Sequence, residues 1–202
     1  MAGIATPTVD HRRATAERNV EAILDAAERL LERRVRPSIV AVARESGLSR
    51  VTVYAHFSTK EELLEAVVAR SVRAATAALE AAEPERGPPL EALERVVSAS
   101  WREVARHEAI RQATAEELSP EAVRRTHEPA AAVLSRLIER GRKEGAFRTD
   151  LPAHWLRVSF FALLHAAADE VRSRRISAQA AAAGLTTTLT ELFAGSRTRR
   201  RR

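Results

Sequence analysis

A short stretch near the N-terminus carries side chains of the kinds that recognise nucleic acids. Arg50 can donate paired hydrogen bonds to a guanine edge or to a phosphate, and Thr52 can hydrogen-bond with either. Tyr54 and His56 have donors that reach the oxygens of the DNA backbone. Lys60 adds a positive charge where a new helix is expected to begin, and the free amide groups there favour a phosphate. These residue types predict an interface with DNA.

The surrounding pattern predicts the elements that position these side chains. Apolar residues recur at spacings of three and four over residues 20–31, which indicates an amphipathic helix with one buried stripe. Ser38 can cap a second helix, and Ser49 can cap a third over residues 50–56, with Gly47 free to adopt positive φ between them. This arrangement is a helix-turn-helix, whose last helix enters the major groove. An ordinary three-helix core with solvated polar residues fits the same spacing.

The rest of the chain is also expected to be helical. Seven Gly, eight Pro and 4% aromatic residues, beside abundant Ala, Leu, Arg and Glu, predict an all-α fold. The capping and breaking residues indicate about nine helices, with the clearest break over residues 83–89. Pro129 is expected to open one of these helices, Asp150 to cap the next and Ser177 to cap the last. We expect four parts: a flexible arm over 1–15, the helix-turn-helix unit over 16–62, a larger helical domain over 63–195 and a basic tail over 196–202.

Charge and cysteine content exclude several classes of protein. The net charge is +6, but five arginines lie within residues 197–202, and without them it is +1. Nucleic-acid binding must therefore come from a local patch. The absence of cysteine excludes disulfide scaffolds, thiol nucleophiles and cysteine-ligated metal sites. No export signal or membrane-spanning segment is evident, so we expect a cytoplasmic protein that does not bind a membrane.

The sequence contains no catalytic motif and no phosphate-binding loop. His165 and Asp169 have the spacing of neighbours on a helix, but a third metal ligand is not evident. We therefore expect neither an enzyme nor a site for a metal or a cofactor.

Two segments of residues 18–64, RNVEAILDAAERLL and VARESGLSRVTVYAHFSTKEELL, resemble the TetR family of transcriptional repressors, and residues 145–150 resemble it more weakly. The resemblance implies a DNA-binding unit in the first three helices and the start of the fourth, and a helical C-terminal domain that binds a ligand and dimerises. It places the DNA contacts on Ser38, Arg50, Thr52, Tyr54, His56 and Lys60. The chain departs from the family pattern at residues 33–36, where a glycine is usual, and at Val51, which either meets a thymine methyl group or packs.

The last two predicted helices carry apolar residues on more than one face, so one core contact cannot bury them all. Ala180 and Gly184 lie one turn apart on the final helix, where another helix could approach closely. Two such helices from each of two chains would form a four-helix bundle with two-fold symmetry, although a helix of the same chain could also cover this surface. The predicted interface residues are Phe160, Leu163, Ala167, Val171, Ala180, Gly184 and Leu185.

A group of aromatic and histidine side chains on the C-terminal helices is suited to an effector pocket, although each could simply be packed in the core. They are Trp101, His107, Trp155, Phe161 and His165. The sequence as a whole predicts a dimeric repressor that binds a roughly palindromic double-stranded operator and is released by a small-molecule effector. A helical protein-interaction module and a helical enzyme with an apolar cavity are the alternatives.

Overall fold

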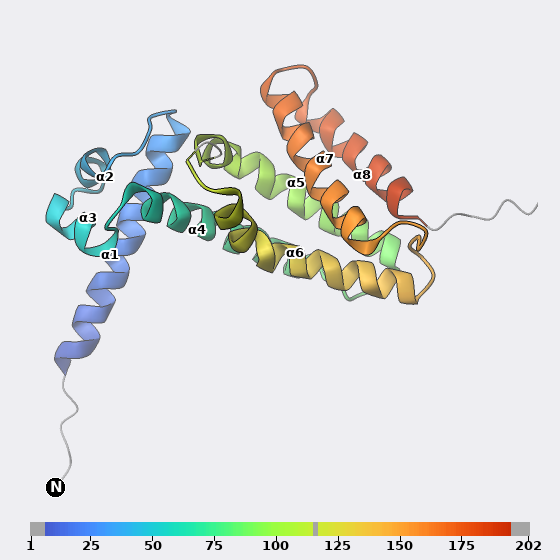
Figure 1. Cartoon of the computed structure of the whole chain (residues 1–202), viewed down its shortest axis with the longest axis horizontal. Coiled ribbons are helices and arrows are strands. Elements are labelled where there is room, and N and C mark those ends of the chain that lie inside the picture. The colour runs from blue at the N-terminus through green and yellow to red at the C-terminus, as the bar shows by residue number, and fades with distance from the viewer. Residues whose placement is uncertain (1–6, 115–116, 195–202) are drawn as a thin grey trace, which may run out of the picture. The chain divides into compact units, whose positions relative to one another are not determined.

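The chain forms eight α-helices in a computed structural model that describes residues 7–114 and 117–194 (Figure 1). Over these residues the only pairing of the β type is an isolated bridge between Phe147 and Ala194, so the predicted all-α fold is confirmed. The helices are α1 (Pro7–Glu32), α2 (Ile39–Ser46), α3 (Arg50–His56), α4 (Lys60–Ala81), α5 (Pro89–Thr114), α6 (Pro120–Lys143), α7 (Ala153–Arg172) and α8 (Ala178–Phe193).

Eight helices are one fewer than expected, because α6 continues through Pro129, where a new helix was predicted to begin. A proline inside a helix removes one hydrogen bond and strains the preceding turn, but packing on the following turns can outweigh this cost. Val133 and Leu134, one turn later, are fully buried. Packing of these side chains therefore keeps α6 continuous, although Pro129 favours a helix end at this point.

The helices form two compact units. The first comprises residues up to Ala69 together with 109–122, and the second comprises Arg70–Glu108 together with the residues from Val123 onward. The first unit contains the range of 16–62 that we expect for the helix-turn-helix unit, which stays a prediction. It takes in the beginning of α4 because that part of the helix buries apolar side chains, namely Leu63, Leu64, Val67 and Val68. The segment 109–122 is an addition that the sequence did not predict.

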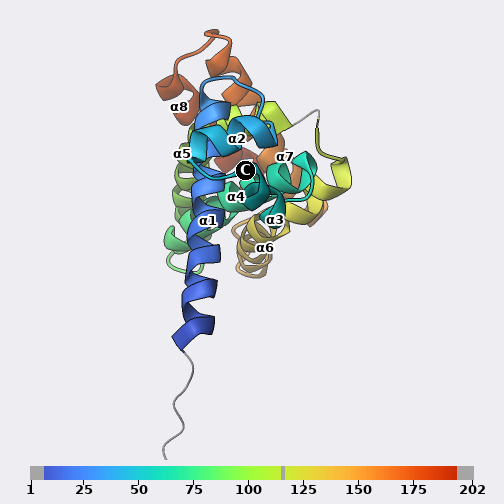
Figure 2. The same ribbon diagram turned by 90° about the vertical axis from the view of Figure 1, so that its left-hand side faces the viewer.

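In the first unit, α2 lies against α1 and α3 lies against α2 (Figure 2). The predicted apolar stripe of α1 is buried, as at Ile23, Leu24 and Leu31. Residues 7–15, which we expected to be part of a flexible arm, instead form the first turns of α1. An ion pair of 3.1 Å between Arg13 and Glu17, one turn apart, favours helix there. Residues 1–6 of the expected arm and the basic tail lie outside the described residues.

The caps that define α2 and α3 are those predicted. The Ser38 hydroxyl accepts a hydrogen bond from the Ala41 amide, and the Ser49 hydroxyl accepts one from the Thr52 amide. Gly47 between them has φ of +72°, which an L side chain rarely adopts. Glu45 then ties α2 to α1, since its carboxylate lies 3.1 Å from Arg29 and 2.6 Å from Arg33. These two ion pairs hold the end of α2 against the C-terminal end of α1.

The second unit consists of the end of α4, most of α5 and α6, and α7 and α8 around one apolar core. Three phenylalanines meet edge to face in that core: Phe147 and Phe160 each pack against Phe193, with ring centroids 5.4 and 6.4 Å away. Ser177 caps α8 as predicted. Asp150 was expected to cap α7, but Pro152 holds the cap position and the Asp150 carboxylate instead accepts two hydrogen bonds from Arg148.

Candidate functional site

Helix α3 presents one face to the solvent and buries the other. Val53 is fully buried, whereas Arg50 is exposed and the side chains of Val51 and Tyr54 are 79% and 52% exposed. Val51 therefore does not pack within its own chain. Arg50, Val51 and Tyr54 form a row that no residue of the described chain covers, as a recognition helix requires.

Thr52 and His56 are half-buried on α3 and are less free than their neighbours. The Thr52 hydroxyl lies 2.8 Å from the Ser49 hydroxyl, so it shares a hydrogen bond with the cap of its own helix. His56 borders an open groove of about 360 Å³, which the N-terminal part of α1 also lines through His11, Arg12, Thr15, Ala16 and Asn19. This groove extends the candidate interface onto α1, whose early start the sequence did not predict.

Ser38 and Lys60 lie at the first turns of the helices on either side of α3. Ser38 is exposed, and its hydroxyl hydrogen remains available after the oxygen has capped α2. Lys60 is already paired: its Nζ donates a hydrogen bond of 2.6 Å to Oε1 of Glu117.

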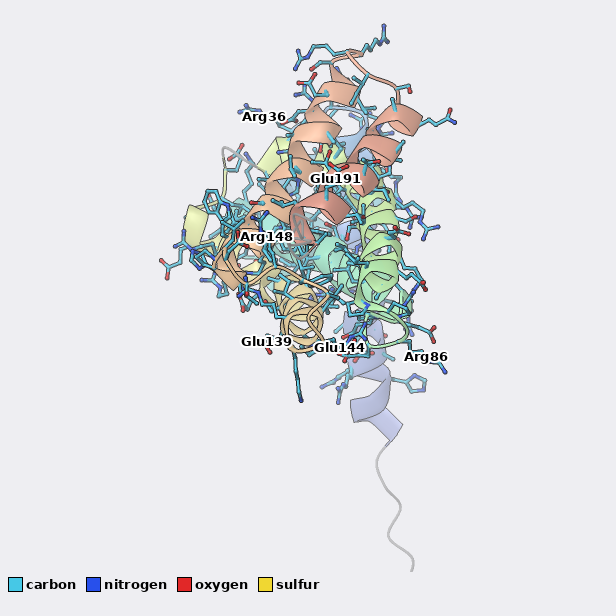
Figure 3. The ribbon with its side chains drawn as sticks, turned by 90° about the vertical axis from the view of Figure 1, so that its right-hand side faces the viewer. Arg36, Arg86, Glu139, Glu144, Arg148 and Glu191 are labelled. Atoms are coloured by element: carbon cyan, nitrogen blue, oxygen red, sulfur yellow. The ribbon has the colours of Figure 1, made fainter. Side chains whose placement is uncertain are left out.

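Glu117, in the segment between α5 and α6, is a residue that the sequence reasoning missed. Its carboxylate lies 2.6 Å from Lys60 and 3.8 Å from Arg36, whose exposed side chain extends away from the ribbon (Figure 3). The hydrogen bond from Lys60, helped by the charges of both cations, holds the pKa of Glu117 below its ordinary value. A carboxylate thus competes for two cations that a phosphate would use. No local signal reveals this, because 57 residues separate Glu117 from Lys60.

The predicted effector residues are distributed unevenly over the second unit. Trp101 is buried in the apolar core, and Phe161 packs against that core with its ring 5.3 Å from Phe160. His107 and His165 are half-buried, and Nδ1 of His107 lies 3.0 Å from the Glu103 carbonyl oxygen. Trp155 is 52% exposed on α7, so the structure does not bring it together with Trp101.

The three buried polar residues of α5, Ser100, Glu103 and Thr114, were not predicted, and the first two lie near the predicted effector residues Trp101 and His107. These two lie one turn apart on the face that also carries His107. The sequence pattern could have revealed Ser100 and Glu103, because they interrupt an otherwise apolar stripe on this helix.

The predicted dimer residues also divide into two groups. Phe160 and Leu185 are buried in the core of their own chain, and Leu163, Ala167 and Val171 are half-buried against it. Ala180 and Gly184 are exposed on α8. An exposed row on α7 that the prediction did not include has the same helical spacing: Trp155, Val158, Ala162 and Ala166.

The described part of the chain offers neither a cluster of metal-binding side chains nor a membrane-spanning helix. No group of three or more His, Asp or Glu side chains in residues 7–114 and 117–194 could hold a metal ion. Among the same residues, no helix has the length and apolar character needed to cross a membrane.

Two sequence models of known protein families match this chain. A sequence model described as bacterial regulatory proteins of the tetR family matches residues 23–67, which include α2, α3 and the start of α4. A second, described as a tetracyclin repressor-like C-terminal domain, matches residues 89–170, from α5 into α7. No curated protein matched the chain.

Solved structures share the fold over most of the chain. LfrR from Mycobacterium smegmatis, in complex with proflavine, is 24% identical with a TM-score of 0.66, over 88% of this chain and 97% of that one. PfmR from Thermus thermophilus is 24% identical with a TM-score of 0.67, over 84% and 97%. FadR from Bacillus subtilis, in complex with stearoyl-CoA, is 16% identical with a TM-score of 0.74, over 86% and 98%. Since the two sequence models together span more than half of the chain, it belongs to the tetR family of bacterial regulatory proteins.

Proposed function

We propose that the chain is a dimeric transcriptional repressor that binds a roughly palindromic operator and is released by a small-molecule effector. The observation that carries this proposal is the exposed row of Arg50, Val51 and Tyr54 on a short helix fixed by Ser49 and Val53. Arginine can pair with a guanine edge, and an exposed valine fits a thymine methyl group. The family consists of regulators, so the chain is a regulator and not an enzyme. Because its target is DNA, we place its action in the cytoplasm.

The exposed faces of α7 and α8 support a dimer. Trp155 and Val158 expose large apolar surface, which a partner would remove from water. On α8, a Cβ added to Gly184 would meet nothing within 4 Å in its own chain, so a helix of the partner has room to approach closely. We omit Phe160 and Leu185 from this interface because their own chain buries them. Pairing these helices by two-fold symmetry gives a four-helix bundle with two copies of α3. Such copies read half-sites about 34–36 Å apart.

The complexes of LfrR with proflavine and FadR with stearoyl-CoA support a small-molecule site in the second unit. Release from DNA requires the effector to bind one arrangement of the dimer better than the other. A coupling of about 2–3 kcal/mol weakens operator binding roughly 30- to 150-fold. Trp101, His107, Phe161 and His165 remain the proposed lining, whereas the exposed Trp155 fits the dimer surface better.

A mobility-shift assay with the DNA upstream of the chain's own gene tests the proposal, at physiological salt and with competitor DNA. The wild type should retain one fragment, and Arg50→Ala should weaken that binding. Arg102→Ala, which removes an exposed arginine of α5 in the second unit, is the matched control and should bind as the wild type does. Absence of sequence-specific binding, with capture of a protein partner by the first unit, would favour a protein-interaction module instead.

A further inference from the structure

Glu103 is a buried acidic residue of the second unit whose charge is only partly matched. It is 8% exposed, on the part of α5 that carries the buried Trp101. One carboxylate oxygen lies 3.5 Å from Arg106, but that arginine is itself largely in solvent. The other oxygen, Oε2, is buried and has no hydrogen-bonding partner among the residues that the structure describes.

His107 does not supply the missing partner. Its Nδ1 lies 3.7 Å from Oε2 of Glu103, which is beyond hydrogen-bonding distance. The same nitrogen lies 3.0 Å from the Glu103 carbonyl oxygen, which can only accept, so the Nδ1 hydrogen is donated to the backbone.

Ser100, one turn earlier on the same face of α5, shows a second deficit of the same kind. It is 3% exposed, and its hydroxyl oxygen has no hydrogen-bonding partner within the described ranges. A serine within a helix commonly donates to the carbonyl oxygen four residues before it, as Ser135 does in α6. Ser100 makes no such bond, so its hydroxyl group is available to a molecule other than the chain.

Buried polar groups in folded proteins are nearly always hydrogen-bonded, and a buried carboxylate with one oxygen left without a hydrogen bond is a costly exception. Two exceptions one turn apart have a common explanation if a bound molecule satisfies both. That molecule must carry positive charge and N–H donors to match Glu103. The buried Trp101 and the partly buried Val104 supply apolar surface on the same helix, which suits an organic body attached to the charge.

We propose that Glu103 and Ser100 form the polar end of the effector site and that the effector is an organic cation bearing N–H donors. The inference rests on the proposed function, which places a small-molecule site in this unit. In this arrangement the Glu103 carboxylate accepts the N–H groups of the ligand and matches its charge, and the Ser100 hydroxyl group forms a neutral hydrogen bond beside them. The same carboxylate disfavours ligands whose buried part is anionic.

Ligand titrations on the full-length protein without DNA test this inference. The probes are two aromatic cations with amino groups, proflavine and ethidium, and one anionic ligand, stearoyl-CoA. The wild type should bind at least one cation and bind it more tightly than stearoyl-CoA. Glu103→Gln keeps the shape but removes the charge, and it should weaken cation binding about 30-fold or more. Ser100→Ala should weaken it about two- to tenfold.

Glu94→Gln is the matched control, because Glu94 is an exposed acidic residue of the same helix. It should bind the cation as the wild type does. Thermal unfolding is the second readout. Without ligand, Glu103→Gln should unfold at a higher temperature than the wild type, because the partly matched buried charge is gone. The cation should raise the Tm of the wild type and of Glu94→Gln by the same amount, and that of Glu103→Gln by less. A Glu103→Gln variant that binds cations undiminished, or a wild type that binds neither cation, overturns the inference. A wild type that binds neither cation but still retards the operator DNA in the mobility-shift assay contradicts this inference alone. Failure to retard the operator contradicts the proposed function.

Discussion

Replacing Glu117 by glutamine should strengthen the binding of DNA. The carboxylate of Glu117 lies 2.6 Å from Lys60 of the proposed interface and 3.8 Å from Arg36, so it now occupies the place of an anion beside these two cations. The substitution removes this competitor while keeping the size of the side chain. Lys60 then becomes fully available to a phosphate.

The expected magnitude is modest, because the Lys60 and Glu117 side chains remain 33% and 22% exposed and water screens such pairs. We expect affinity at physiological salt to rise about two- to fivefold. One additional phosphate contact steepens the dependence of log K on log salt by about 0.9, so binding should fall about 3.5-fold more than in the wild type between 50 and 200 mM salt. Fluorescence anisotropy with a labelled operator duplex measures both quantities.

Two further variants isolate the cause. Glu121→Gln makes the same change of charge at an exposed residue in the first turn of α6, and it should leave the salt dependence as it is in the wild type. In a Lys60→Gln background, Glu117→Gln should lose most of its effect, because the cation through which it acts is absent. A loss of affinity in Glu117→Gln would refute the reasoning and would show that the carboxylate holds Lys60 in place for DNA. An equal gain in Glu121→Gln would attribute the effect to overall charge.

Other substitutions test the remaining parts of the account. Arg50→Ala should cost about 1–3 kcal/mol of operator binding and relax specificity at one base pair; equal losses on all sequences, measured by competition, would mean that Arg50 contacts only phosphate. Gly184→Leu should shift the dimer toward monomer in sedimentation velocity, and an unchanged dimer would exclude α8 from the interface. Hydrogen bonds from Arg33 and Arg29 hold the pKa of Glu45 below its ordinary 4.5, so its contribution to stability is present above pH 4.5 and is lost as the pH falls through the lowered pKa. Glu45→Gln should therefore lower the Tm at neutral pH and make the decrease of Tm in acid smaller than in the wild type. An equal decrease of Tm in both proteins would contradict this. Gly141→Ala should lower the stability by about 1–3 kcal/mol, because the new Cβ would overlap the buried Phe147 ring; unchanged thermal unfolding would contradict that packing.

The first unit could be predicted in detail because its determinants are local. A capping serine such as Ser38 or Ser49 and a glycine such as Gly47 act on the residues beside them, and the structure has them in those roles. Contacts over long separations could not be predicted. The pairing of Lys60 with Glu117 depends on where the segment between α5 and α6 packs, and the sequence does not encode that as a pattern.

In the second unit the sequence indicated the type of each element but not the side that each presents to the core. The predicted apolar excess of α7 is present, yet Phe160 faces the core of its own chain while Trp155 faces solvent. A helix that is apolar all round cannot show from its periodicity which face meets the same chain and which remains for a partner. Pro129 shows the same limit, because packing after it overrides the local preference to end a helix.

The most direct test of DNA recognition by α3 is a DNase footprint on the DNA upstream of the gene. The wild type and Arg50→Ala are compared at protein concentrations that give the same binding to an unrelated DNA fragment. Recognition by a pair of α3 helices predicts two protected half-sites related by symmetry, with centres one helical turn or a multiple of it apart, and loss of protection in Arg50→Ala. Protection that is uniform along the fragment, or that is the same for both proteins, would contradict it.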